Sequence, residues 1–194
     1  MAKKIKILTI FLAALAIIIT SCATEYFLLD EQMPERVVGY KMTSLDSVEK
    51  MRTNQFKIYD GGMCSLRKME VTQLLADFTV EVDGGEGIRF AFRTVRNKYE
   101  QQPKIAFDYT PNGTVLKEND EVIADVDSIK LEYNEPKRVV IKNDGRYYYV
   151  TVDCDTVHTG YTRMPATEFV IIETLPGSNA VLSGIDFAEI LDKF

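Results

Sequence analysis

The sequence predicts an all-β protein, built as an antiparallel two-sheet β-sandwich with at most one or two short helices. Three observations favour this fold class. Beyond Gly61 and Gly62, apolar and polar residues alternate with a period of two almost to the end of the chain. The alternating runs are short and are separated by turn signals rich in Gly, Pro, Asn and Asp. Almost no helical pattern lies between them, which is typical of a sandwich or a barrel.

The start of the chain is typical of a secretory signal peptide. Three lysines among the first six residues precede an apolar run of 13 residues from Ile7 to Ile19, and small or polar residues follow. A helix that spans a bilayer takes roughly 20 apolar residues, so this run is short for a permanent transmembrane segment. We therefore expect residues 1–21 to be removed as a signal peptide.

The residues Ile19-Thr20-Ser21-Cys22 resemble the bacterial lipobox. This resemblance implies that Cys22 becomes the first residue of the mature protein and carries diacylglycerol and a further acyl chain. Each buried methylene contributes about 0.8 kcal/mol, so several acyl chains hold a protein on a membrane stably. Cys22 is followed by Ala23 and not by an aspartate, which in lipoproteins of this type goes with transport to the outer membrane. The resemblance therefore implies a lipid-anchored protein of the cell envelope, at the outer membrane. An ordinary signal peptide with a coincidental cysteine is the alternative.

The rest of the chain is expected to hold a short lead and one domain. Residues 22–35 would carry the lipid anchor and the lead, and residues 36–194 would form a single domain, since 194 residues with 46% hydrophobic content suffice for one core. Loss of the three N-terminal lysines leaves 20 of the 23 basic residues against 29 acidic ones, a net charge near -9. No run of Lys or Arg remains, which argues against nucleic acid as a partner.

The elements of the domain follow from its local patterns. Thr43 to Asp46 has the spacing of a capping box, and Leu45, Val48 and Met51 recur at helical intervals, so we expect a short helix there. The later segments are predicted to be strands. They cover 78–83, 88–93, 104–110, 122–125, 128–133, the hairpin 138–153, 168–175 and 183–190.

Two hairpins are predicted in detail. In the first, the Gly-rich loop 84–87 joins strands 78–83 and 88–93, and an odd loop pairs Val82 with Ile88 and Glu81 with Arg89. In the second, a two-residue Asp144-Gly145 turn sets Ile141 opposite Tyr148. The pleat then gives this hairpin a core face and an outer face. The core face holds Val139, Ile141, Tyr148, Val150 and Val152, and the outer face holds Val140, Lys142, Tyr147, Tyr149 and Thr151.

Three segments together resemble the concanavalin A-like lectin/glucanase superfamily, which includes laminin G-like jelly rolls. They are the strand-loop-strand FTVEVDGGEGIRFAFR, the hairpin VVIKNDGRYYYVTVD and the closing strand SGIDFAEI. The resemblance covers residues 64–190 and implies a jelly-roll topology. Such domains usually have a tryptophan before the central hairpin, where this chain has Pro136-Lys137-Arg138 and no tryptophan anywhere. Their members include sugar binders, hydrolases and adhesive modules, so the fold does not select a function.

One segment and the single histidine are the catalytic candidates. Glu81-Val82-Asp83-Gly84-Gly85-Glu86 resembles the paired-glutamate motif of retaining β-glucanases, which needs two carboxyl groups about 5 Å apart. The glycines are expected to curl the chain before Glu86 can join Glu81 on one strand face. His158 is the single histidine, and the chain has no nucleophile-elbow sequence such as G-x-S-x-G whose serine it could activate. We therefore expect no catalytic residue, and no spacing in the chain predicts a metal or cofactor site.

Two further pairs of residues are candidates for a role. Tyr147 and Tyr149 would lie beside each other on the outer face of the hairpin, either as a platform on which a sugar ring stacks or as apolar surface covered by another segment. Cys64 and Cys154 remain once Cys22 is assigned to lipid, and an oxidising envelope would let a disulfide between them persist. Two buried thiols are the alternative.

These observations predict an envelope lipoprotein whose β-sandwich is a non-catalytic accessory module that binds a glycan or a protein. Its expected partners are the membrane, through the lipid anchor, and a polysaccharide or an envelope protein. One alternative is a glycan hydrolase or lyase that uses Glu81 and Glu86. A second is a purely structural envelope lipoprotein without a small ligand.

Overall fold

The computed structural model describes residues 41–67, 74–94, 104–164 and 169–189. These residues form antiparallel strands and no helix, so the described part of the chain has no helix that could cross a bilayer. The all-β prediction is confirmed. The strands are β1 (Lys41–Arg52), β2 (Gln55–Arg67), β3 (Leu74–Asp83), β4 (Ile88–Phe92), β5 (Ile105–Thr110), β6 (Gly113–Glu118), β7 (Glu121–Val126), β8 (Lys137–Asp144), β9 (Tyr147–Val152), β10 (Asp155–Tyr161), β11 (Phe169–Thr174) and β12 (Asn179–Glu189).

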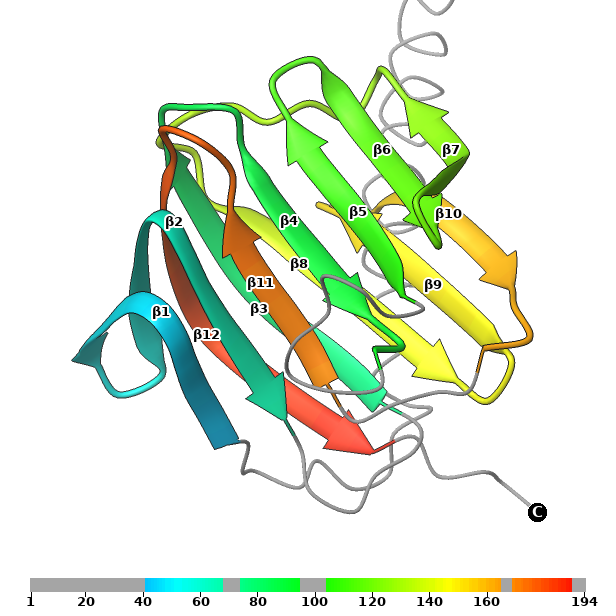
Figure 1. Cartoon of the computed structure of the whole chain (residues 1–194), viewed down its shortest axis with the longest axis horizontal. Coiled ribbons are helices and arrows are strands. Elements are labelled where there is room, and N and C mark those ends of the chain that lie inside the picture. Colours follow the sequence, from blue (N-terminus) through cyan, green and yellow to red (C-terminus); the bar gives the residue numbers. More distant parts are fainter. Residues whose placement is uncertain (1–40, 68–73, 95–103, 165–168, 190–194) are drawn as a thin grey trace, which may run out of the picture. The chain divides into compact units, whose positions relative to one another are not determined.

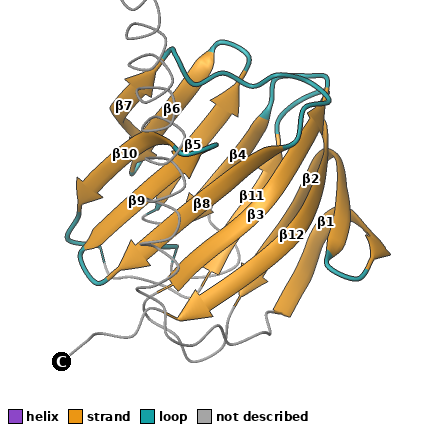
Figure 2. Cartoon of the chain, turned by 180° about the vertical axis from the view of Figure 1, so that it is seen from behind, coloured by secondary structure: helices purple, strands orange, loops and turns teal. Residues whose placement is uncertain are grey.

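The strands form one continuous sheet that folds over on itself. Its order is β10-β9-β8-β3-β12-β2-β11-β4-β5-β6-β7, with β1 added beside β2. Figures 1 and 2 show the result as two layers, with β11, β4, β5 and β6 in one and β12, β3, β8 and β9 in the other. The prediction of two separate sheets therefore needs correction, because a single sheet wraps almost into a barrel. The two ends of the sheet approach each other where Thr162, just after β10, donates a hydrogen bond of 2.5 Å to Glu118 on β6, the strand next to the edge strand β7.

Strand β2 makes the fold of the sheet possible because its two halves pair with different neighbours. Residues 55–58 pair with β12, whereas residues 63–67 pair with β11. Gly62 lies between these halves, and a Cβ atom there would meet the carbonyl oxygen of Tyr59 at 2.6 Å and that of Ser47 at 2.9 Å. Only glycine fits this close approach of backbone segments.

The space between the layers is filled by the inward residues of both. Phe78 on β3 lies 5.4 Å from Phe90 on β4, and Phe90 stacks on Phe107 at 4.7 Å, measured between ring centroids. All three side chains are fully buried. Because β3 and β4 belong to opposite layers, this aromatic cluster joins the two halves of the sheet through one core.

Two local predictions from the sequence are wrong for identifiable reasons. The segment expected to be a short helix is the strand β1, and its pairing with β2 contains register shifts near Ser44, Asp46 and Val48. Such bulges interrupt the alternation of apolar and polar residues, so the sequence pattern of this segment does not indicate a strand. Residues 128–133 are not a strand but a loop between β7 and β8.

The first predicted hairpin is also wrong. Strand β3 pairs with β12 and β8, and β4 pairs with β11 and β5, so β3 and β4 are not paired to each other. Val82 faces Ala180 rather than Ile88. The loop 84–87 instead carries the chain from one layer to the other, and a Cβ atom on Gly85 would lie 2.3 Å from the backbone of Ser178. Gly85 therefore allows the close contact of two loops and does not form a hairpin turn.

The second predicted hairpin exists as β8 and β9, with a different register. Ile141 faces Val150, and Asp144 faces Tyr147, so the turn residues are Gly145 and Arg146. This shift of two residues keeps each side chain on its predicted face, because the pleat repeats every two residues. The predicted core face is buried throughout, with Val139, Ile141, Tyr148, Val150 and Val152 each no more than 3% exposed.

Candidate functional site

The outer face of β9 and β10 carries an exposed pair of tyrosines. Tyr147 and Tyr161 are neighbours across these strands, and the two residues are 61% and 53% exposed. Their ring centroids lie 5.1 Å apart at 74°, an edge-to-face contact. The two rings form a corner open to solvent, which is a surface on which the C–H face of a sugar ring could stack.

The sequence predicted one member of this pair and missed the other. Tyr149 lies on the same face as Tyr147 but is partly buried and faces Thr159. Tyr161 was missed because β10 was not predicted as a strand. Its β-branched residues at 156, 157 and 159 were a signal, but a register shift between Thr156 and His158 interrupts the alternation.

A buried arginine holds the base of this corner. Arg93 follows β4 in the opposite layer, is 1% exposed, and donates hydrogen bonds to the carbonyl oxygens of Gly145 at 2.9 Å and Tyr147 at 2.8 Å. Burial lowers the pKa of this guanidinium. On the surface, Arg146 donates a hydrogen bond of 2.9 Å to the hydroxyl of Tyr161. The corner is therefore fixed at its backbone and at one ring.

The layer beneath the corner is tightly packed. Tyr148 points inward, and its ring lies 5.6 Å from Phe92 and 5.7 Å from His158. Gly160 lies opposite Tyr148, where a Cβ atom would come within 2.4 Å of the tyrosine ring and hydroxyl. His158 thus packs against an aromatic ring, and within the described part of the chain no nucleophile is found bonded to it.

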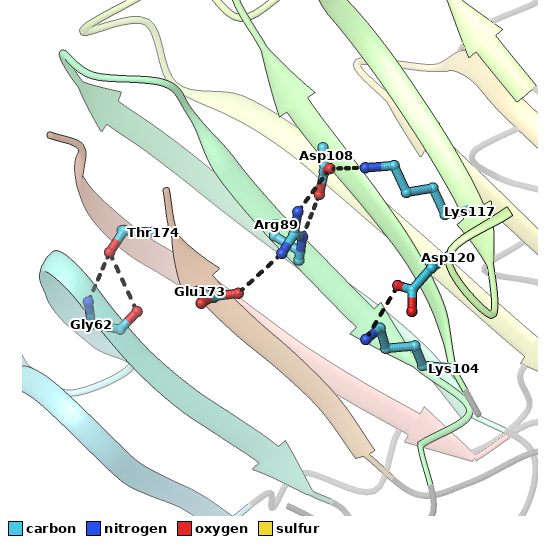
Figure 3. Close-up of polar contacts among 8 residues, drawn as sticks. All are labelled: Gly62, Arg89, Lys104, Asp108, Lys117, Asp120, Glu173 and Thr174. Atoms are coloured by element: carbon cyan, nitrogen blue, oxygen red, sulfur yellow. Dashed lines mark hydrogen bonds and ion pairs between the residues drawn. The ribbon is translucent and has the colours of Figure 1, made fainter. Parts of the chain in front are cut away.

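A second polar cluster crosses the outer face of the other layer, on β11, β4, β5 and β6 (Figure 3). Arg89 lies between two carboxylates, with Nε 2.5 Å from Asp108 and Nη1 3.6 Å from Glu173. Lys117 adds an ammonium 2.9 Å from Asp108. The predicted Glu81 to Arg89 pair is replaced by these contacts, because β3 and β4 belong to different layers.

The two carboxylates of this cluster have opposite pKa shifts. Burial alone would raise the pKa of Asp108, but hydrogen bonds from Arg89 and Lys117 lower it overall. Burial raises the pKa of Glu173, and the charge of Arg89 offsets this only in part. Opposite shifts can mark an acid and a base. Here, however, both oxygens of Asp108 accept hydrogen bonds from fixed cations, so this carboxylate is not free to act as a nucleophile or base.

The glutamates of the hydrolase alternative lie apart. Glu81 is within β3, whereas Glu86 is in the exposed loop after Gly84 and Gly85, both of which have positive φ. The backbone N–H of Glu86 donates to the carbonyl of Pro176 at 3.0 Å. The two glutamates therefore do not share a strand face, which the retaining mechanism requires. Among the described residues, no group of three or more His, Cys, Asp or Glu side chains could hold a metal ion.

The cysteines differ from the predicted pair. Cys64 is a free and fully buried thiol on β2, so it forms no bridge with Cys154. Cys154 lies in the tight turn between β9 and β10, and Cys64 pairs with Ile172 in the other layer. Burial raises the pKa of the Cys64 thiol to about 12. Cys22, the predicted lipidation site, lies outside the described residues.

No family model matches this chain, and no curated protein matches it. Solved structures do resemble it. The carbohydrate binding module CBM66 from Bacillus subtilis aligns with a TM-score of 0.56 at 12% identity, over 78% of this chain and 96% of that one. The exoplasmic/lumenal domain of VIP36, solved in a Ca2+/Man-bound form, aligns with a TM-score of 0.57 at 9% identity, over 80% and 84%.

A putative glycosyl hydrolase from Parabacteroides distasonis also aligns, with a TM-score of 0.51 at 9% identity, over 77% of this chain and 99% of that one. At such identities the likeness concerns the fold alone. It is consistent with the jelly-roll topology of concanavalin A-like lectins, which the sequence predicted. Binding proteins and a putative enzyme share this architecture, so the choice between them depends on the residues of this chain.

Proposed function

We propose that this chain is a non-catalytic carbohydrate-binding module of the bacterial cell envelope. Its fold is similar to that of a carbohydrate binding module and of the VIP36 exoplasmic/lumenal domain solved in a Ca2+/Man-bound form. The observation that carries the proposal is the exposed corner of Tyr147 and Tyr161 on the outer face of β9 and β10. Exposed aromatic rings fixed on a rigid sheet contact a flat apolar partner at little cost in conformational entropy.

Polar groups beside the corner suit the hydroxyl groups of a glycan. Arg146 is exposed and bonded to Tyr161. Lys142 and Asp144 form an ion pair of 3.4 Å in the adjacent strand β8. Together these side chains offer donors and acceptors around two apolar ring faces, a combination typical of sugar recognition. A polysaccharide is therefore favoured over a protein partner.

The proposal is tested by retention of the purified protein on a panel of bacterial and plant polysaccharides, measured by affinity electrophoresis. Tyr147→Ser combined with Tyr161→Ser should weaken retention about tenfold or more, corresponding to about 1.4 kcal/mol. Tyr59→Ser is the matched control, because Tyr59 is 38% exposed on β2, away from the corner. Retention that survives the double substitution would exclude the corner as the site.

The same assays separate binding from catalysis. Each polysaccharide that retains the protein is also incubated with it, and reducing ends are measured over time. The proposal expects no release, because Asp108 is occupied by cations and Glu81 and Glu86 lie apart. Release that disappears in Glu81→Gln would overturn the non-catalytic assignment.

We further propose that Cys22 is lipid-modified and holds the module on the outer membrane. The residues Ile19-Thr20-Ser21-Cys22 after an apolar signal segment support this proposal. Expression in a bacterial host with radioactive palmitate should label the protein, and Cys22→Ser should remove the label. Labelling that is unchanged in Cys22→Ser would exclude this anchor.

A further inference from the structure

A pocket of about 280 Å3 lies at the far end of β9 from the tyrosine corner. Tyr147 begins β9, whereas Val152 ends it and lines the pocket. The other walls come from the end of β5, the loop between β7 and β8, and the start of β10. The pocket is therefore separate from the surface proposed above.

The pocket has an apolar floor and a charged rim. Tyr109, Ile129 and Val152 form the floor, and each is no more than 8% exposed. The rim includes Glu132 and Asp153, whose side chains are 60% and 44% exposed. A concave site with an apolar base and a few convergent polar groups is the usual form of a small-molecule site.

The loop that forms one wall is fixed by hydrogen bonds even though it is not a strand. The hydroxyl of Tyr109 donates to the carbonyl of Lys130 at 2.9 Å, and Thr114 donates from Oγ1 to the carbonyl of Ile129 at 2.7 Å. The backbone N–H of Leu131 donates to the carbonyl of Thr110 at 3.0 Å. This wall of the pocket is thus ordered before a ligand binds, so ordering it adds little to the free-energy cost of binding.

Lys137 organises the rim. Its ammonium lies 2.8 Å from Glu132, 3.2 Å from Glu135 and 3.5 Å from Asp153. One oxygen of Asp153 also accepts the backbone N–H of Arg138 at 2.8 Å. The carboxylates are held in place but remain partly exposed, so each can still accept hydrogen bonds from a ligand.

The charge around the pocket is negative. Lys130 and Lys137 supply two cations, while Glu132, Asp153 and Asp155 in the lining, together with Glu135 on Lys137, supply four carboxylates. Carboxylates accept hydrogen bonds from hydroxyl and ammonium groups and repel other carboxylates. The pocket volume lies just below the usual range for drug-sized ligands, about 300 to 1,000 Å3, which suits a single sugar ring.

We infer that this pocket is a second glycan site that binds one neutral or amino-bearing pyranose ring and excludes uronates. The inference rests on the proposed function, and it adds the class of sugar and a place for a single sugar unit. The ring's C–H face would lie on the floor of Tyr109, Ile129 and Val152. Its hydroxyl or amino groups would donate to the rim carboxylates.

The test uses the purified full-length protein in detergent and nine probes. These are the methyl glycosides of glucose, galactose and mannose, with the 2-amino and the uronic acid counterpart of each. Affinities are measured by titration with ligand-observed NMR. In at least one of the three series, the neutral or amino sugar should bind at least about tenfold more tightly than the uronate. A uronate that binds as tightly as its neutral counterpart in every series that binds would overturn the inference.

Three variants locate the binding. Ser128→Trp would fill the pocket from its exposed rim and should weaken binding of the preferred sugar at least about tenfold. Asn112→Trp, in an exposed turn outside the lining, is the matched control and should leave binding unchanged. Asp155→Lys should raise the affinity for the uronate of that series, because it removes one negative charge from the rim and adds a positive one.

The outcomes separate this inference from the proposed function. Binding that is unaffected by Ser128→Trp, or binding to none of the nine probes, would overturn the pocket. Retention on a polysaccharide that depends on Tyr147 and Tyr161 would in either case leave the proposed function standing. Loss of both pocket binding and polysaccharide retention would overturn both proposals.

Discussion

Arg93 donates a hydrogen bond of 2.8 Å from Nη2 to the backbone carbonyl oxygen of Tyr147, although the two residues lie in opposite layers of the sheet. The same guanidinium also reaches the carbonyls of Gly145 at 2.9 Å and Met164 at 2.5 Å. It lies 5.9 Å from the centroid of the Tyr148 ring, within the range of a cation–π contact. One buried cation thus joins the end of β4 to the turn that carries the proposed ligand surface.

Arg93→Met is expected to destabilise the domain by about 3 kcal/mol, because it leaves three partly buried carbonyl oxygens without the donor that the buried guanidinium provides. The measurement is urea unfolding followed by circular dichroism. Arg93→Lys is the matched control, since it keeps a charge that can reach one carbonyl but not three, and it should fall between the parent and Arg93→Met. Equal stability of Arg93→Met and the parent would contradict the proposed role of this arginine.

Much of the fold could be predicted from the sequence because burial dictates alternation. The core face of the 138–153 hairpin was predicted residue by residue, and the prediction holds although the strand register differs by two residues. A register that slips by two keeps every side chain on its face, whereas a slip by one would have exchanged the faces. The alternation of apolar and polar residues therefore specifies the face on which a side chain lies more reliably than the residue that it faces on the next strand.

Strand partners could not be predicted in the same way. The Gly-rich loop after β3 was interpreted as a hairpin turn, but its Gly85 is required by contact with the backbone of Gly177 and Ser178. That contact joins segments about 90 residues apart in the chain. The proposed sites also depend on which segments lie side by side. Tyr147 contacts Tyr161 because β10 pairs with β9, and Lys137 contacts Asp153 because the turn after β9 lies beside the start of β8.

Gly160→Ala is expected to destabilise the domain by about 1 to 3 kcal/mol, because the new Cβ would lie 2.4 Å from the buried Tyr148 ring. Gly61→Ala provides the comparison. No atom lies within 4 Å of a Cβ at Gly61, where only the positive φ of 66° is strained. In a double-mutant cycle with Tyr148→Leu, the cost of Gly160→Ala should largely disappear. An undiminished cost would mean that the Tyr148 ring is not the obstacle.

Asp108→Asn is expected to lower stability at pH 7 by about 3 kcal/mol, since it leaves Arg89 and Lys117 without their shared carboxylate. The folded pKa of Asp108 is depressed, so its contribution is present above the unfolded value of about 3.9 and is lost as the pH falls through the folded pKa. The deficit of the variant should therefore shrink as the pH falls below the unfolded pKa, measured by urea unfolding.

Glu173→Gln provides a control of opposite sign. The folded pKa of Glu173 is raised, so its charged form costs stability as the pH rises through that pKa. Relative to the parent, Glu173→Gln should gain stability from pH 3 to pH 7, whereas Asp108→Asn should lose it. Parallel pH profiles for the two variants would contradict the opposite pKa shifts.

Cys64 is expected to resist alkylation in the folded protein. Its thiol is fully buried and its pKa is raised to about 12, so almost no thiolate is present or accessible at pH 8. Iodoacetamide should therefore leave Cys64 unmodified under native conditions and modify it fully in urea, as measured by peptide-resolved mass spectrometry. A cysteine introduced by Thr53→Cys, in the exposed turn between β1 and β2, should react under both conditions and shows that the reagent is active. Protection of Cys64 that persisted in urea without reductant would instead indicate a disulfide, contrary to the free thiol of the structure.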